Sequence, residues 1–117
     1  MPGLRDLIDG WSNGRAVRGA AVISEDGLMV HQSLAAVADG EAVAALAVSL
    51  LRSGGQLGEA GRSGAVRTVV LDLTGGPAII APVDDRHTLI VFAKANIDIG
   101  PLLHEIGLQR EAVSAAI

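Results

Sequence analysis

The apolar residues of the chain form helix-spaced patterns and short continuous runs, with polar and glycine-rich breaks between them. Residues 3–12 come first, and their apolar positions recur at the spacing of one helix face: Leu4, Leu7, Ile8 and Trp11. This spacing predicts a short amphipathic helix. Gly14 follows it and is suited to the left-handed conformation that ends many helices.

Two apolar runs, Ala20–Ile23 and Leu28–Val30, flank the polar segment Ser24-Glu25-Asp26-Gly27. Because glycine accepts a positive φ without steric cost, Gly27 predicts a tight turn and therefore a β-hairpin. Neither run alternates between apolar and polar residues, so both faces of the hairpin should be covered. We therefore expect the hairpin in the middle of a sheet with helices on each face.

A long helix is predicted from Asp39, its N-cap, to about Ala60. It is apolar nearly all round from Ala42 to Leu51, which indicates burial of more than one face. Glycines at 54, 55 and 58 weaken the prediction, since each costs up to about 1 kcal/mol relative to alanine. A helix that ends at Arg52 and continues as a glycine-rich loop is an equally good interpretation.

Three further strands are predicted at Val66–Leu73, Pro77–Val83 and His87–Lys94. The breaks between them are three residues long or close to it, which favours antiparallel neighbours. Pro82 has no N–H to donate and should lie at a strand end or a bulge. A last helix follows, capped by Asn96 or Asp98; its apolar side comprises Leu102, Leu103, Ile106 and Val113. Gly107 weakens it midway.

Composition narrows the function classes. The 117 residues fit a single domain, 1–117, and a hydrophobic content of 50% argues against disorder. The net charge of −4 disfavours nucleic acid and anionic membranes as partners. There are no cysteines, secretory signal or membrane-length apolar stretch, so we expect a cytoplasmic protein without membrane insertion.

The order helix, two strands, helix, three strands, helix resembles that of the Roadblock / dynein light chain family, including its bacterial gliding-motility GTPase regulators. The residues that carry the resemblance are Arg18–Leu28, the alanine-rich helix 39–60, Ile79–Val83, and Ala95-Asn96-Ile97 with Gly100. It spans about residues 3–113. The glycines at 54, 55 and 58 depart from the family pattern.

The resemblance implies an α+β, Roadblock- or profilin-like fold with a five-stranded antiparallel sheet between helices. The hairpin would lie beside the last strand and the 66–73 strand at one edge. The terminal helices would cover one face and the long helix the other. It also implies a homodimer in which the long helices meet and the 66–73 edges pair, and a non-catalytic platform for a small Ras-like GTPase.

Two sets of site residues follow from the resemblance. The expected dimer interface comprises Val43, Leu46, Ala47, Leu50, Gly54, Val66, Thr68 and Val70. The expected partner-binding residues lie on the exposed side of the long helix: Glu41, Ala45, Ser49, Arg52, Gln56 and Glu59.

Catalytic and ligand motifs are weak in this sequence. The segment 54–58 lacks the Gly-Lys-Ser/Thr of a phosphate loop, and Ser24 lacks the surroundings of a nucleophile elbow. No two of His31, His87 and His104 have the spacing of a helical metal pair. Asp84 and Asp85 diverge on an extended chain, and Arg86 beside them is typical of a solvated turn. We therefore expect no enzyme activity, metal or cofactor.

Three function hypotheses remain. The first is a homodimeric scaffold that binds a small Ras-like GTPase and modulates its nucleotide cycle or localisation. The second is a small-molecule sensor, against which the aromatic content of 2% counts. The third is an assembly subunit of a signalling or motor complex that is indifferent to nucleotide.

Overall fold

The computed structural model describes residues 3–12, 16–36 and 38–117, and it contains a five-stranded antiparallel sheet with helices on both faces. Its elements are α1 (Leu4–Ser12), β1 (Val17–Ser24), β2 (Met29–Ser33), α2 (Gly40–Ala60), β3 (Val69–Leu71), β4 (Ala78–Pro82), β5 (His87–Ala93) and α3 (Ile99–Ala116). The strand order is β2-β1-β5-β4-β3. The predicted fold class and order of elements are thus confirmed.

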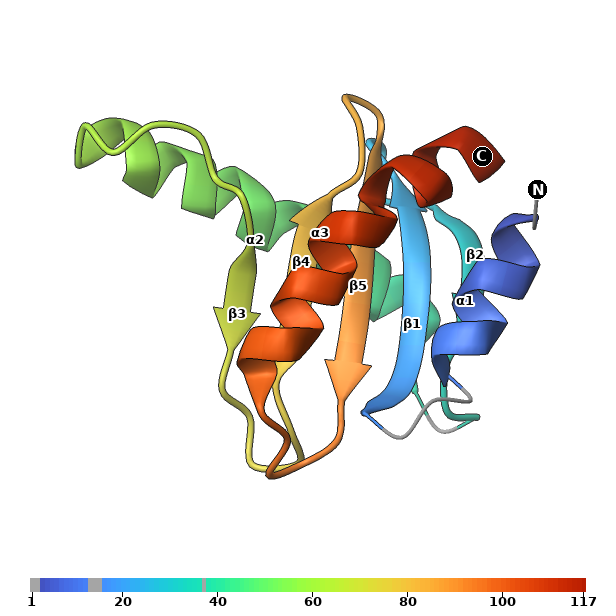
Figure 1. Ribbon diagram of the computed structural model, residues 1–117. Helices are drawn as coiled ribbons and strands as arrows, with labels where there is room; N and C mark the ends of the chain where they lie inside the picture. Colours follow the sequence, from blue (N-terminus) through green and yellow to red (C-terminus); the bar gives the residue numbers. More distant parts are fainter. Residues whose placement is uncertain (1–2, 13–15, 37) are drawn as a thin grey trace.

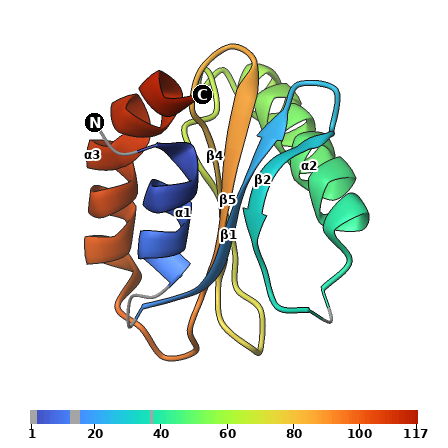
Figure 2. The ribbon, with the colours of Figure 1, turned by 90° about the vertical axis from the view of Figure 1, so that its right-hand side faces the viewer.

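The two faces of the sheet carry separate apolar cores. Figure 2 shows the sheet edge-on, with α1 and α3 on one side and α2 on the other. Ala20 and Val22 of β1 face α1 and α3, whereas Ala21 and Ile23 face α2. This alternation follows the period of two along a strand and explains why β1 is apolar throughout.

The first hairpin closes as predicted but does not occupy the middle of the sheet. Gly27 has φ +79°, its N–H donates to the carbonyl of Ser24, and the N–H of Ser24 donates to the carbonyl of Leu28. Leu28 belongs to this closure, so β2 begins one residue later than the predicted run Leu28–Val30, at Met29, and continues to Ser33. Only β1 is interior; β2 forms an edge, and β5 is central.

The long helix is a single element. α2 begins after Asp39, whose carboxylate accepts the N–H of Ala42 at 3.1 Å, and continues through all three glycines to Ala60. Beyond Ala60 the N–H of Arg62 donates to the carbonyl of Glu59, and that of Ser63 to Gly58. This is the Schellman pattern, with Arg62 at φ 54° in the position that glycine usually takes. The glycine-rich loop interpretation is therefore excluded.

The strand predicted at Val66–Leu73 is much shorter, comprising only Val69–Leu71. In its register with β4, Val69 lies opposite Ile80, which extrapolates to Arg67 opposite Pro82. Proline has no N–H for a ladder hydrogen bond, so pairing stops before that point. Pro82 is the last residue of β4, as predicted for a strand end.

The last helix begins after Asp98, whose side chain accepts the N–H of Gly100 at 3.2 Å. Asn96, the alternative cap, instead has φ 63° in the preceding loop. Ile106 and Val113 are buried, and Leu102 and Leu103 pack against the same core. In α1, Leu4 and Leu7 face that core as well. The side chains of Ile8 and Trp11 and the predicted stop at Gly14 lie outside the described part.

Two glycines of α2 provide a matched test of the packing of this helix. A Cβ on Gly58 would overlap the carbonyl oxygen of Gly64, whereas a Cβ on Gly55 would have no heavy atom within 4 Å. We expect Gly58→Ala to lower the free energy of unfolding by roughly 1–3 kcal/mol through overpacking. Gly55→Ala should raise it by up to about 1 kcal/mol through helix propensity. Urea unfolding of both variants measures the difference; equal effects would contradict the close approach of Gly58 to Gly64.

Candidate interaction surface

The outer side of α2 carries all six expected partner-binding residues. Every one of them is exposed: Glu41, Ala45, Ser49, Arg52, Gln56 and Glu59. Ala45 lies beside the β1–β2 turn, since a Cβ on Gly27 would lie 3.8 Å from the Cα of Ala45. Arg52 and Glu25 line the same hollow. This polar flank therefore faces the end of the sheet that holds the β1–β2 and β4–β5 turns.

A second flank of α2 is apolar, and its residues follow one another at intervals of three, four and seven positions. It comprises Val43, Leu46, Leu50 and Leu57. Leu46 is 61% exposed and Leu57 is 75% exposed, whereas Val43 and Leu50 are half-buried against the core beneath the helix. Residues at this spacing share one side of a helix. Leu57 was missing from the expected interface, although the continued spacing would have included it.

Two residues of the expected dimer interface face inward instead. Ala47 is 1% exposed and packs against the sheet beneath it. A Cβ on Gly54 would lie 3.3 Å from methyl groups of Val66 and Val69, so Gly54 faces β3. Ala47 is therefore buried within a single copy, and Gly54 is half-buried. Their small size brings α2 close to its own sheet.

The β3 edge of the sheet is open. β3 pairs with β4 on one side, and no other strand in the described chain pairs with its outer edge. Val70 is 42% exposed on the face opposite to Val69 and Leu71. Val66 and Thr68 are half-buried in the segment that leads into the strand. Figure 1 shows the C-terminal half of α2 extending beyond this edge.

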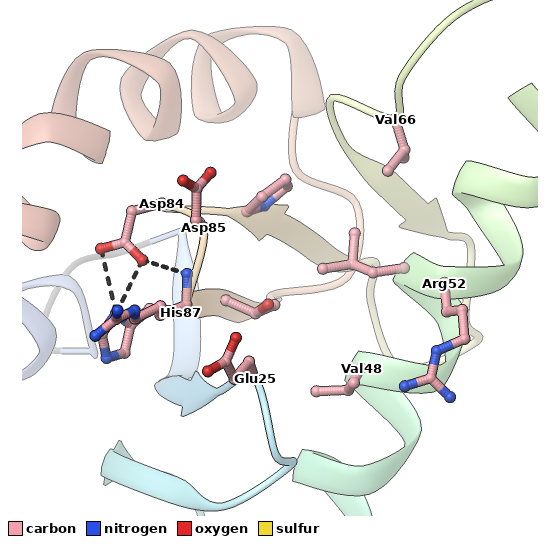
Figure 3. Close-up of a pocket in the computed structure, with 11 residues that line it drawn as sticks. Glu25, Val48, Arg52, Val66, Asp84, Asp85 and His87 are labelled. Carbon is pink, nitrogen blue, oxygen red and sulfur yellow. Dashed lines mark hydrogen bonds and ion pairs between the residues drawn. The ribbon is translucent and has the colours of Figure 1, made fainter.

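A hollow of about 290 Å³ lies between the polar flank of α2 and the β4–β5 turn. Its apolar lining comprises Val48, Leu51, Val66 and Pro82. Figure 3 shows Asp84 and His87 in contact on one side of it and Arg52 on the other, across the hollow. The charged groups therefore do not converge on one point, as a reacting centre would require.

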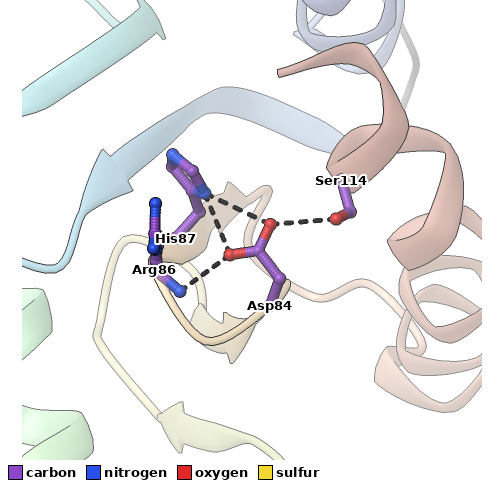
Figure 4. Close-up of polar contacts among 4 residues, drawn as sticks. All are labelled: Asp84, Arg86, His87 and Ser114. Carbon is purple, nitrogen blue, oxygen red and sulfur yellow. Dashed lines mark hydrogen bonds and ion pairs between the residues drawn. The ribbon is translucent and has the colours of Figure 1, made fainter.

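Asp84 connects the β4–β5 turn to α3, a contact that the sequence did not reveal (Figure 4). Its carboxylate accepts the N–H of Arg86 at 2.8 Å and the hydroxyl of Ser114 at 2.9 Å, and lies 2.9 Å from Nδ1 of His87. The carboxylate stands between serine and histidine. A catalytic serine needs the histidine as its direct neighbour, so this trio holds two elements together and does not form a nucleophile.

The same contacts change the acidity of Asp84. Partial burial, the largest single influence, opposes ionisation. The hydrogen bonds from Arg86 and Ser114, and His87 with its charge, together outweigh it and lower the pKa of Asp84 below its ordinary value of 3.8. The turn at Asp84, predicted to be solvated only, is therefore hydrogen-bonded to α3 through Ser114.

The described residues hold no group of three or more His, Asp and Glu side chains able to bind a metal. No helix in the described parts of the chain combines the length and apolar character needed to cross a bilayer.

Comparison with known protein families shows to which family the chain belongs. The profile of the Roadblock/LC7 domain matches residues 5–93. The chain belongs to the Roadblock/LC7 family. The match begins in α1 and ends with β5, so it includes α2 and the whole sheet.

Solved structures agree with this assignment. A Roadblock/LC7 domain from Streptomyces avermitilis is 25% identical, with a TM-score of 0.85 over 97% of each chain. MglB from Myxococcus xanthus is 13% identical, with a TM-score of 0.78 over 96% of this chain and 90% of its own. An MglB described as having a tetrameric arrangement is also 13% identical, with a TM-score of 0.81 over 97% and 86%. Among curated protein sequences, none matches.

The lowered pKa of Asp84 generates a pH-dependent prediction. The ionised carboxylate stabilises the fold fully above about pH 4, and this stabilisation is lost as the pH falls through the folded-state pKa. We expect Asp84→Asn to cost about 1 kcal/mol at pH 7, the order of a few exposed hydrogen bonds. The difference from the unmodified protein should shrink below pH 4. Urea unfolding from pH 7 to pH 3 measures it, and a constant difference would contradict the assignment.

Proposed function

We propose that this Roadblock/LC7 domain is a non-catalytic homodimeric scaffold that binds a small Ras-like GTPase and modulates its nucleotide cycle or localisation. The observation that carries the proposal is the apolar flank of α2 beside an open sheet edge. Leu46 and Leu57 are exposed on that flank, and Val70 is exposed at the edge. Exposed apolar surface next to an open strand is typical of a protein interface.

A second copy of the chain satisfies both features at once. A two-fold axis perpendicular to the sheet, beside β3, would pair two β3 edges in antiparallel fashion and keep both α2 helices on one face. The part of α2 that extends beyond β3 in Figure 1 would then cover the partner's sheet. Val43, Leu46, Leu50 and Leu57 would face the partner's helix, and Val66, Thr68 and Val70 the partner's edge.

The polar flank of α2 would stay exposed in such a dimer. Glu41, Ala45, Ser49, Arg52, Gln56 and Glu59 lie on the other side of the helix from Leu46 and Leu57. We assign the GTPase contact to this polar flank. In this proposal any change in GTP hydrolysis would come from positioning the switch loops of the GTPase.

The first test concerns the dimer. Leu57→Glu should raise the dimer dissociation constant at least tenfold, because it places charge within an apolar contact. Leu108→Glu is the matched control, since Leu108 is 62% exposed on α3, which covers the face of the sheet opposite to α2. Leu57 is a better choice than Leu50, which is half-buried in the chain's own core. Sedimentation equilibrium measures both variants. If the unmodified protein is a monomer at a concentration of about 10⁻⁵ M, the dimer is refuted.

The second test concerns the GTPase. Small Ras-like GTPases encoded in the same genome would be loaded with GDP or a GTP analogue and titrated with the protein. We expect Arg52→Glu to weaken binding roughly tenfold while the dimer persists, with Arg5→Glu on α1 as the control. Equal binding of both nucleotide states would favour the assembly-subunit hypothesis. Failure of every such GTPase to bind would refute the scaffold role.

A further inference from the structure

A hollow of about 360 Å³ lies at the N-terminal end of α2, apart from the hollow beside Asp84. Its lining is mostly apolar and consists of Gly19, Leu34, Ala35, Ala38, Ala42, Val43, Leu46 and Phe92, with Arg18 and Asp39 as the charged members. The volume lies within the range of small-ligand sites.

Among the described residues, short side chains line much of this space. Ala35, Ala38 and Ala42 line it where longer apolar residues would occupy it. Gly19 cannot take a Cβ, which would lie 2.9 Å from the carbonyl oxygen of Ser33. Phe92 is the single phenylalanine of the chain and is only half-buried here. An aromatic ring and aliphatic walls thus face an open volume.

The two charged residues of the hollow, Asp39 and Arg18, differ in their ability to bind a ligand. The carboxylate of Asp39 already accepts the N–H of Ala42 at the start of α2. Nε of Arg18 donates to the carbonyl of Ala93 at 3.1 Å, which holds the guanidinium group at the hollow. A guanidinium group held in this way suits a carboxylate or another oxyanion.

We infer that this hollow binds a small amphipathic acid, with its apolar body against Phe92, Leu34 and Val43 and its carboxylate at Arg18. The inference goes beyond the scaffold role and needs no GTPase. The hollow beside Asp84 is a poorer match to such a ligand, since three carboxylates, Glu25, Asp84 and Asp85, line it beside its basic residues.

The probe is octanoate, compared with 1-octanol as the neutral molecule of the same chain length. Calorimetric titration of the isolated protein should show saturable octanoate binding, with a dissociation constant on the order of 0.1–1 mM. Octanol should bind roughly tenfold more weakly, because it makes no charged contact with Arg18. Absence of binding by both probes would overturn the inference.

Two matched pairs of variants locate the site. Ala42→Leu should fill the hollow and abolish binding of both probes, whereas Ala45→Leu, on the polar flank of the same helix, should leave binding unchanged. Arg18→Gln should remove the preference for octanoate over octanol, and Arg5→Gln on α1 should preserve it. Octanoate binding that survives Ala42→Leu would overturn the inference, as would a preference that survives Arg18→Gln.

A second copy of the chain is the rival occupant, since Val43 and Leu46 belong both to the hollow and to the apolar flank of α2. If the partner subunit fills the hollow, octanoate should bind the Leu57→Glu variant but not the unmodified dimer, and this outcome would overturn the inference. Sedimentation of the same samples reports the oligomeric state separately. A failed GTPase titration therefore leaves the octanoate result intact, and the reverse holds as well.

Discussion

The fold depends on burying both faces of two adjacent strands, β1 and β5. Ala20, Ala21, Val22 and Ile23 of β1 are fully buried, and Leu89, Ile90 and Val91 of β5 nearly so. A strand with apolar side chains on both faces is stable only when each face is covered. The helices meet that requirement, α1 and α3 on one face and α2 on the other.

The way α2 meets this requirement determines the surface it presents. The residues that contact the sheet most closely are small, Ala44 and Ala47, with Gly54 facing β3. Small residues bring the helix backbone close to the strands, and Leu46, Leu50 and Leu57 lie on the flank. An alanine-rich helix therefore covers its own sheet and still exposes Leu46 and Leu57. The apolar flank is a direct result of how the core is packed.

Local chemistry made much of the fold predictable. The turn at Gly27, the cap at Asp39 and the end of β4 at Pro82 each depend on one residue and its immediate neighbours. The helical nature of residues 54–60 was not predictable, because tertiary contact overrides the low helix propensity of glycine. The length of β3 was overestimated, since the limiting residue, Pro82, lies on another strand.

The candidate surfaces were predictable only as far as they follow helix periodicity. Helix spacing correctly placed the six residues of the polar flank, from Glu41 through Glu59, on one exposed side of α2. Spacing alone did not reveal which side of the helix faces the sheet, and Ala47 and Gly54, expected at the dimer interface, face the chain's own sheet. The Asp84–Ser114 hydrogen bond joins residues thirty positions apart. The hollow beside Phe92 depends on side chains left small around it, which no local pattern records.

The close approach of Gly58 to Gly64 determines where the end of α2 lies relative to β3. The chain leaves α2, turns at Arg62 and runs back along the helix through Val66 directly into β3. Only eight residues separate the last residue of α2 from the first residue of β3. The projecting end of the helix therefore stays next to the open strand, so one partner can contact both surfaces.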